Sequence, residues 1–172
     1  MATEKLEFKI ELYATMWDQP PHAEILINDQ SCFKKDITGT MEKPDVIQFH
    51  YDLEEGQKYD LIIKRSGKPK YRRSWPRWHQ NRNQTVVNEK GDILRDQLMH
   101  IKLIEIDEIN IGGLVYNGEY TPRYPEPWAS QQRHAGVELP ESFKNVTTMG
   151  HNGQWKLSFE SPFYMWLLEN LY

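Results

Sequence analysis

The sequence of 172 residues has one cysteine, Cys32, and no continuous apolar run long enough to cross a membrane. A lone cysteine excludes an internal disulfide, so packing must hold the fold together, and we interpret Cys32 as a small buried apolar residue. A spanning helix needs about 20 consecutive apolar residues, so no transmembrane helix is expected. Residues 1–13 alternate charged and apolar side chains and lack the apolar core of a signal peptide. We therefore expect synthesis in a reducing cytoplasm.

Acidic residues are missing from the middle of the chain. No aspartate or glutamate lies between Asp60 and Glu89, although the whole chain has a net charge of -4. Residues 64–82 of this gap, KRSGKPKYRRSWPRWHQNR, hold eight lysine and arginine side chains with aromatic side chains between them. We call residues 64–82 the basic strip. Crowded cations without counter-charges repel one another, so they must be solvated or must face an anionic partner.

The basic strip combines the residue types that anchor protein interfaces. Arginine and tryptophan are the types most enriched among the energetic anchors of such interfaces. The same mixture suits acidic polysaccharides and phosphate backbones, but the rest of the chain is acidic and carries no nucleic-acid module signature. The alternative is a solvated loop whose tryptophans pack back on the domain. The candidate partner-binding residues are Lys70, Tyr71, Arg72, Arg73, Trp75, Arg77 and Trp78.

A period of two in hydrophobicity predicts that the chain is built from strands. Leu6, Phe8, Ile10 and Leu12 alternate with charged residues, which predicts a half-buried antiparallel strand with these four side chains in the core. We expect further strands at 23–27, 31–33, 46–51, 58–64, 85–87, 93–94, 98–111 and 154–159. The segment 98–111 is expected to be one long strand with a bulge near Asp107, and residues 53–56 a hairpin connection.

Short helices are expected only late in the chain, one starting at Pro140 and one of two to three turns after Ser161. Eight or so short strands at intervals of roughly ten residues favour an all-β fold. We predict a single domain over residues 1–172, an antiparallel β-sandwich of the jelly-roll type. It should carry a long loop containing Pro, Tyr and Trp, and a short C-terminal helix.

The long segment from Gly112 to Pro140 intersperses prolines among aromatic residues. Loops of this length in a compact domain are usually functional or are pinned to the surface by their own side chains. The candidate glycan-stacking residues are Tyr116, Tyr120, Tyr124 and Trp128. The alternative is a rigid cover over one sheet edge, and the density of proline favours this cover.

No motif in the sequence identifies a metal site or a reaction. Calcium is the one cofactor left open, because hard oxygen ligands are present, although their spacing matches no calcium loop and turn carboxylates usually satisfy backbone amides. These oxygen ligands belong to Asn88, Asp92, Asp96, Asp107 and Glu108. The six histidines do not recur at zinc spacing.

Catalytic motifs are equally missing: there is neither a nucleophile elbow nor a phosphate-cradling glycine loop. Ser130 and His134 lie in the long segment without a recognisable third partner. A pair of glycosidase carboxylates needs only to meet in space, so sequence alone leaves such a pair open. We predict that the protein is not an enzyme.

Several segments carry a resemblance to a known group of proteins. They are LMHIKLIEIDEINI at 98–111, GHNGQWKLSFESPFYMWLLE at 150–169, TVVNEKGDILRDQL at 85–98, YPEPWASQQRHAGVELPE at 124–141 and a strand ending at Gly67-Lys68. On these segments the chain resembles the small uncharacterised β-sandwich proteins of marine tailed phages, cyanophages especially. Their sandwich is similar to that of the calcium-dependent xylan-binding carbohydrate-binding modules. The chain departs from this pattern after Lys68, where it is enlarged and very basic, and the calcium aspartates of the xylan-binding modules are not carried over.

The resemblance implies a virion structural or accessory protein that docks on the capsid, neck or tail. Other virion proteins would then be its partners, in an oligomeric or multi-copy assembly, and the chain made in the host cytoplasm would end in the virion. The second similarity implies an alternative, a carbohydrate-binding module that mediates adhesion to host glycans. Neither implies a membrane or a nucleic-acid partner.

Overall fold

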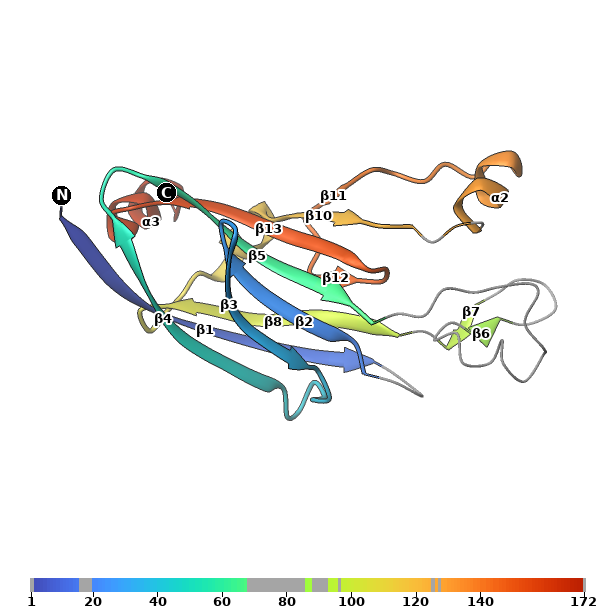
Figure 1. Cartoon of the computed structure of the whole chain (residues 1–172), viewed down its shortest axis with the longest axis horizontal. Coiled ribbons are helices and arrows are strands. Elements are labelled where there is room, and N and C mark those ends of the chain that lie inside the picture. Colours follow the sequence, from blue (N-terminus) through green and yellow to red (C-terminus); the bar gives the residue numbers. More distant parts are fainter. Residues whose placement is uncertain are drawn as a thin grey trace.

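The computed structural model is a sandwich of two antiparallel sheets with short helices at its ends (Figure 1). It describes residues 2–15, 20–67, 97–124, 126 and 128–171 in full, and residues 86–87 and 93–95 as backbone. The first sheet has the order β12–β8–β1–β4, with β9 paired to β8. Its strands are β1 (Thr3–Thr15), β4 (Asp45–Glu54), β8 (Leu98–Ile106), β9 (Ile109–Asn110) and β12 (Thr148–Met149).

The second sheet has the order β11–β10–β13–β5–β2–β3. Its strands are β2 (His22–Ile27), β3 (Gln30–Asp36), β5 (Lys58–Ser66), β10 (Glu119–Pro122), β11 (Phe143–Lys144) and β13 (Gly153–Glu160). A separate hairpin pairs β6 (Val86–Val87) with β7 (Ile93–Arg95). The helices are η1, a 3-10 helix (Gly112–Asn117), α2 (Trp128–His134) and α3 (Phe163–Leu171). The predicted antiparallel β-sandwich and its C-terminal helix are therefore confirmed, whereas the segment 112–140, which was predicted to be a long loop, contains η1, β10 and α2.

The core between the sheets begins with the apolar face of β1. Leu6, Phe8, Ile10 and Leu12 are at most 1% exposed, as their period of two predicts. The ring of Phe8 stacks on Phe49 of the neighbouring strand β4 at 5.1 Å and meets Phe159 of the opposite sheet at 6.1 Å. Because Phe8 joins both sheets, it belongs to the centre of the sandwich. Cys32 on β3 is partly buried against the same core.

Two expected connections are wrong in the way they join strands. Residues 53–56 do not close a hairpin, because β4 pairs with β1 in the first sheet whereas β5 pairs with β2 and β13 in the second. The chain crosses between the sheets there, with Leu53 buried as the corner and Gly56 at φ 86°. A turn signal in sequence predicts a reversal, but it does not tell which sheet the next strand joins.

The segment 98–111 is a hairpin rather than one bulged strand. Asp107 and Glu108 both have positive φ, 54° and 66°, so the chain reverses and β9 pairs back on β8. Two consecutive left-handed residues are the geometry of the tight turns that close two-residue hairpins. Aspartate tolerates this conformation better than most residues, whereas glutamate gives little sign of it in the sequence.

The helix expected at Pro140 does not form, since Phe143 and Lys144 instead make the edge strand β11. Helix α2 at residues 128–134 was not predicted. Helix α3 follows Ser161 as expected, and the Glu4 carboxylate of β1 accepts the N–H of Phe163 at 3.1 Å and the Ser161 hydroxyl at 2.6 Å. Among the described residues no helix is long and apolar enough to cross a membrane.

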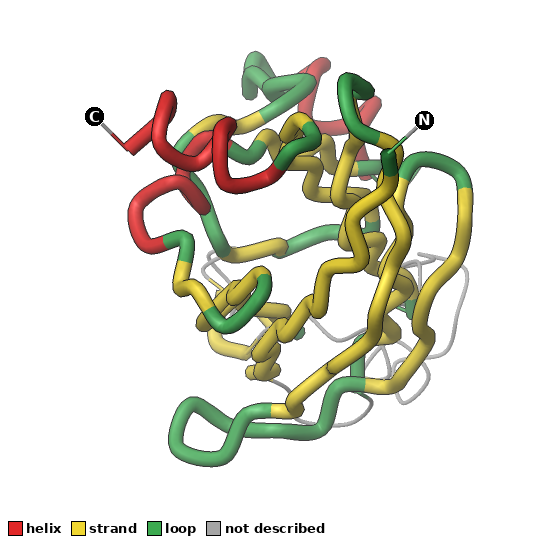
Figure 2. The backbone as a smooth tube through the Cα atoms, turned by 90° about the vertical axis from the view of Figure 1, so that its left-hand side faces the viewer, coloured by secondary structure: helices red, strands yellow, loops and turns green. Residues whose placement is uncertain are grey.

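The elements divide between two ends of the sandwich. Helix α3 lies with the start of β1 at one end of the long axis, while α2 and the β6–β7 hairpin lie at the other (Figure 1). Figure 2 turns the α3 end toward the viewer. We call these the helical end and the hairpin end. Strand β5 runs between them, because Lys58 pairs with Glu160 just before α3 and Ser66 ends the strand on the other side.

Candidate functional site

A buried arginine, Arg65, joins the two chain ends between which most of the basic strip lies. Arg65 on β5 is 1% exposed, and its guanidinium donates to the carbonyl oxygens of Met149 at 2.6 Å and Gln97 at 2.7 Å. It also donates to Gln97 Oε1 at 2.6 Å. Arg65 lies one residue before the end of β5, and Gln97 comes directly before β8. One side chain therefore fastens the strand that enters residues 67–96 to the strand that follows them.

A histidine of the strand that follows Gln97 lies close to this guanidinium. His100 on β8 shares hydrogen bonds of 3.0 Å with the hydroxyls of Thr15 and Thr148, and its ring stacks on Tyr13 at 4.5 Å. Burial, and then the positive charge of Arg65, hold the pKa of His100 below its usual range. Arg65 is therefore part of the framework. The seven candidate partner-binding residues, Lys70, Tyr71, Arg72, Arg73, Trp75, Arg77 and Trp78, lie outside the described residues, and their role stays a prediction.

The candidate calcium ligands do not come together in the part of the chain that can be seen. Asn88, Asp92 and Asp96 lie outside the described residues. Asp107 and Glu108 form the β8–β9 turn, where one Asp107 oxygen accepts the N–H of Glu7 at 3.4 Å and the other accepts the hydroxyl of Tyr164. Across residues 2–15, 20–67, 97–124 and 128–171, no three His, Cys, Asp or Glu side chains lie close enough together to hold a metal ion.

The four candidate stacking aromatics separate into different environments. Tyr116 lies on η1 and is 50% exposed. Tyr120 on β10 is 4% exposed, its ring stacks on Phe143, and its hydroxyl accepts the N–H of His151 at 2.9 Å. A buried ring has no free face for a ligand, so Tyr120 supports the sheet. Tyr124 and Trp128 lie together, with ring centroids 6.2 Å apart.

Tyr124, Trp128 and His151 form one aromatic cluster beside helix α2. The ring of His151 lies 5.2 Å from Tyr124 and 5.4 Å from Trp128. The Tyr124 hydroxyl donates to the carbonyl of Pro140 at 2.6 Å, which ties the segment before α2 to the segment after it. Partial burial raises the pKa of Tyr124, so the hydroxyl stays protonated and acts as a donor.

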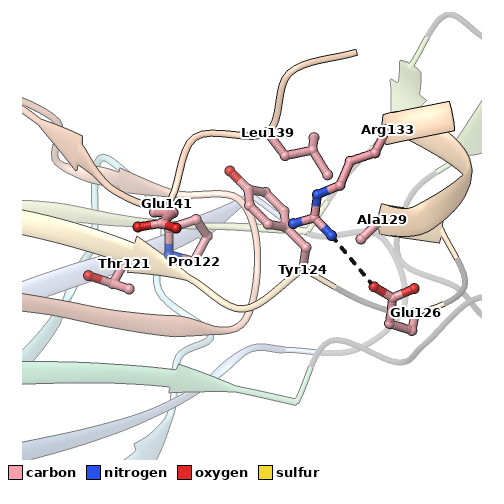
Figure 3. Close-up of a pocket in the computed structure, with 8 residues that line it drawn as sticks. All are labelled: Thr121, Pro122, Tyr124, Glu126, Ala129, Arg133, Leu139 and Glu141. Carbon is pink, nitrogen blue, oxygen red and sulfur yellow. Dashed lines mark ion pairs between the residues drawn. The ribbon is translucent and has the colours of Figure 1, made fainter. Parts of the chain in front are cut away.

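A cavity of about 400 Å³ lies beside Tyr124 of this cluster (Figure 3). Its lining residues are Thr121, Pro122, Tyr124, Glu126, Ala129, Arg133, Leu139 and Glu141. Figure 3 shows the Tyr124 ring between Pro122 and α2, with the ion pair of Arg133 and Glu126, 3.9 Å apart, at one side. Trp128 is not among the lining residues, although its ring lies 6.2 Å from that of Tyr124. The cavity thus offers one aromatic ring and charged hydrogen-bonding groups.

The charged groups of this cavity suit binding better than acid catalysis. The Ser130 hydroxyl donates to Glu126 at 2.7 Å and holds the pKa of that carboxyl below its usual range. A glycosidase general acid needs the opposite shift, so that it is protonated at neutral pH. With its hydroxyl engaged by Glu126, Ser130 also lacks the arrangement that would make it a nucleophile with His134.

Sequence reasoning missed two parts of this site. Ser130 and Arg133 lie three residues apart on α2, and Glu126 lies two residues before the helix and contacts both, so the spacing of four and three residues was the available signal. His151 comes from a distant loop, and no local pattern indicates its position beside Tyr124. Comparisons of the chain with family models, with curated proteins and with solved structures found no match. The resemblance to phage and xylan-binding sandwiches therefore stays a prediction.

Proposed function

We propose that the protein is a non-enzymatic structural or accessory component of a phage virion, which docks on the capsid, neck or tail through residues 70–78 of the basic strip. The observation that supports this proposal is the way in which the two ends of the strip segment are held together. The buried Arg65 joins β5 to Gln97, so both ends of the cationic segment start from one fixed place at the hairpin end. Fixing the ends of a binding segment reduces the entropy that is lost when the segment is ordered on a partner.

The chemistry of the segment favours a protein partner with an acidic face. Cations would steer the approach and set the register, and the tryptophans would add the apolar area that charge alone does not provide. Partners in this proposal are other virion proteins, and the chain is present in many copies. We also propose that the sandwich has jelly-roll topology. The crossings from one sheet to the other at β1–β2, β3–β4 and β4–β5 support that assignment.

Purified phage particles provide the test. Mass spectrometry should detect the chain in them, and the double variant Arg73→Glu with Trp75→Ala should be missing from particles while the isolated protein keeps its unfolding temperature. Lys156→Glu is the matched control, because it reverses one exposed charge on β13, outside the strip. Particles that lack the native chain, or that incorporate the double variant normally, would show that the proposal is wrong.

The cavity beside Tyr124 supports a second candidate function, a carbohydrate-binding module for host glycans. Sugar rings stack on aromatic faces, and the Arg133–Glu126 pair offers planar donors and acceptors for their hydroxyls. A glycan array with the purified protein should then give binding that Tyr124→Ala abolishes. Tyr116→Ala should leave binding unchanged, since Tyr116 is exposed but does not line the cavity. Equal binding by the native chain and Tyr124→Ala would exclude this site.

A further inference from the structure

Helix α3 leaves an apolar stripe uncovered at the helical end. Its buried side faces the core through Phe163, Trp166 and Leu167. The exposed side holds Tyr164 (46% exposed), Met165 (59%), Leu168 (60%) and Leu171 (46%). At 100° per residue these four side chains fall within an arc of about 120°. Single exposed apolar residues are ordinary, whereas a continuous stripe of large ones indicates a contact surface.

Several carboxylates lie near this stripe. Glu4 binds the first turn of α3, and Asp107 accepts the Tyr164 hydroxyl. The acidic turn that ends at Gly56 reaches the same place, because the N–H of Gly56 donates to the Ser161 carbonyl at 2.8 Å. The carboxylates at this end are Glu4, Glu54, Glu55, Asp107, Glu108, Glu160 and Glu169. Nearby cations are Lys5 and Lys58, of which Lys58 lies 3.9 Å from Glu160.

The pKa of Tyr164 reflects the negative charges around α3. This pKa is raised, first because the Tyr164 hydroxyl donates to Asp107, then by partial burial, and also by the negative charges of Asp107, Glu4 and Glu108. The carboxylates of the β8–β9 turn and of β1 thus act together on the surface of the helix. We call the stripe with this acidic surround the α3 face. A partner for this face needs apolar side chains placed among cations.

The basic strip of the same sequence has this composition, but it starts at the opposite end of the sandwich. Strand β5 covers about 27 Å between Lys58 and Ser66 at roughly 3.4 Å per residue. The chain also returns at the hairpin end, since Leu98 at the start of β8 pairs with Thr15 at the end of β1. For a strip to lie on the α3 face of its own copy, the chain would have to run about 27 Å back to the helical end and then the same distance forward to β8.

We propose that the α3 face of one copy binds the basic strip of a second copy, so that copies join head to tail. This inference rests on the proposed function, because both assign residues 70–78 to a protein contact. Arginine and lysine side chains would meet the acidic surround, and Tyr71, Trp75 and Trp78 would cover the stripe. The four side chains of the stripe are too few for the roughly 800 Å² per partner of a stable interface, so the acidic turns are part of the contact.

A symmetric pairing of two α3 faces is disfavoured, because it would bring two acidic surfaces together. The two surfaces of the proposed contact differ, since the α3 face lies at the helical end whereas β5 ends, and the strip begins, toward the hairpin end. Such a heterologous contact does not close in a pair, and repeated copies form a ring or a filament. This is the geometry expected of a multi-copy component.

Two variants of the full chain, each lacking one surface, test the inference by sedimentation velocity. The face variant is Leu168→Glu, and the strip variant is Arg73→Glu with Trp75→Ala. The native chain should sediment faster as its concentration rises, and each variant alone should stay a single chain. An equimolar mixture should form a complex of two chains that grows no further, because only one intact strip and one intact face remain to meet.

Val46→Glu is the matched control, since it places a carboxylate at another exposed apolar residue, on β4, and should assemble like the native chain. Thermal unfolding shows whether Leu168→Glu is folded, and a more conservative Leu168→Ser replaces it if it is not. Assembly of the face variant alone, pairing of the strip variant with itself, or a mixture that stays single chains would overturn the inference. A native chain that is found in particles but stays a single chain in solution overturns it too, and leaves the proposed function standing.

Discussion

Replacing Arg65 by methionine is expected to destabilise the sandwich, because three buried oxygen atoms lose their donor. Hydrogen bonds from a charged group contribute about 1.5–3 kcal/mol each. To groups that the structure describes, the guanidinium donates three of them, to the two carbonyls and to the Gln97 amide oxygen. The variant no longer needs to desolvate a cation, a cost of several kcal/mol that offsets much of this loss. A net loss of about 2–4 kcal/mol in the free energy of unfolding remains.

Urea unfolding followed by tryptophan fluorescence measures this loss, and the thermal midpoint should fall by about 5–15 °C. Lys64→Met is the matched control, because it removes the same charge from the neighbouring, exposed position of β5. The control should stay within about 0.5 kcal/mol of the native chain. If the two variants unfold alike, or if Arg65→Met costs less than about 1 kcal/mol, the hydrogen bonds of Arg65 to Gln97 and Met149 do not stabilise the sandwich as inferred.

Phe8→Ala should cost about 3–5 kcal/mol, because the ring is fully buried between the sheets, and an unchanged thermal midpoint would exclude that placement. The lowered pKa of His100 means that the unfolded chain binds more protons, so stability should fall as the pH drops below the usual histidine value of 6.5. His100→Asn should flatten this dependence between pH 7 and pH 5, and an unchanged slope in urea midpoints would contradict the assignment. Gly118→Ala should destabilise by about 1–3 kcal/mol, because an added Cβ would clash with the buried Trp155 indole. Gly113→Ala, where the added Cβ meets nothing within 4 Å, should change the unfolding midpoint little, and equal effects of both alanines would disprove the clash.

Period-two alternation was enough to predict the long strands that build the core, whereas the short strands β10, β11 and β12 were not predicted. In β1 every second residue is apolar over most of its length, and all four predicted core residues are buried, because only one face of a strand in a sandwich meets the other sheet. The same holds for Trp155, Leu157 and Phe159 in β13. Local alternation is a property of neighbouring residues, so the sequence alone can show it.

Connections and site geometry depend on residues that are far apart in the sequence. Gly56 was expected to close a hairpin, yet its strand neighbours belong to different sheets, a choice made by packing across the whole sandwich. The burial of Arg65 was hidden for the same reason. In the sequence Arg65 is one of the eight cations of the strip. Its burial is evident only from its hydrogen bonds to Gln97 and Met149, which are distant in the sequence.

Because Arg65 joins β5 to Gln97, residues 67–96 can vary in sequence without moving the strands on either side. Residues 67–96 leave and re-enter the sandwich at one place, so the register of the strands does not depend on their length or composition. Each doubling of a flexible loop costs only about 0.6 kcal/mol of closure entropy. The length and composition of this segment can therefore change while the framework residues that hold its ends stay the same.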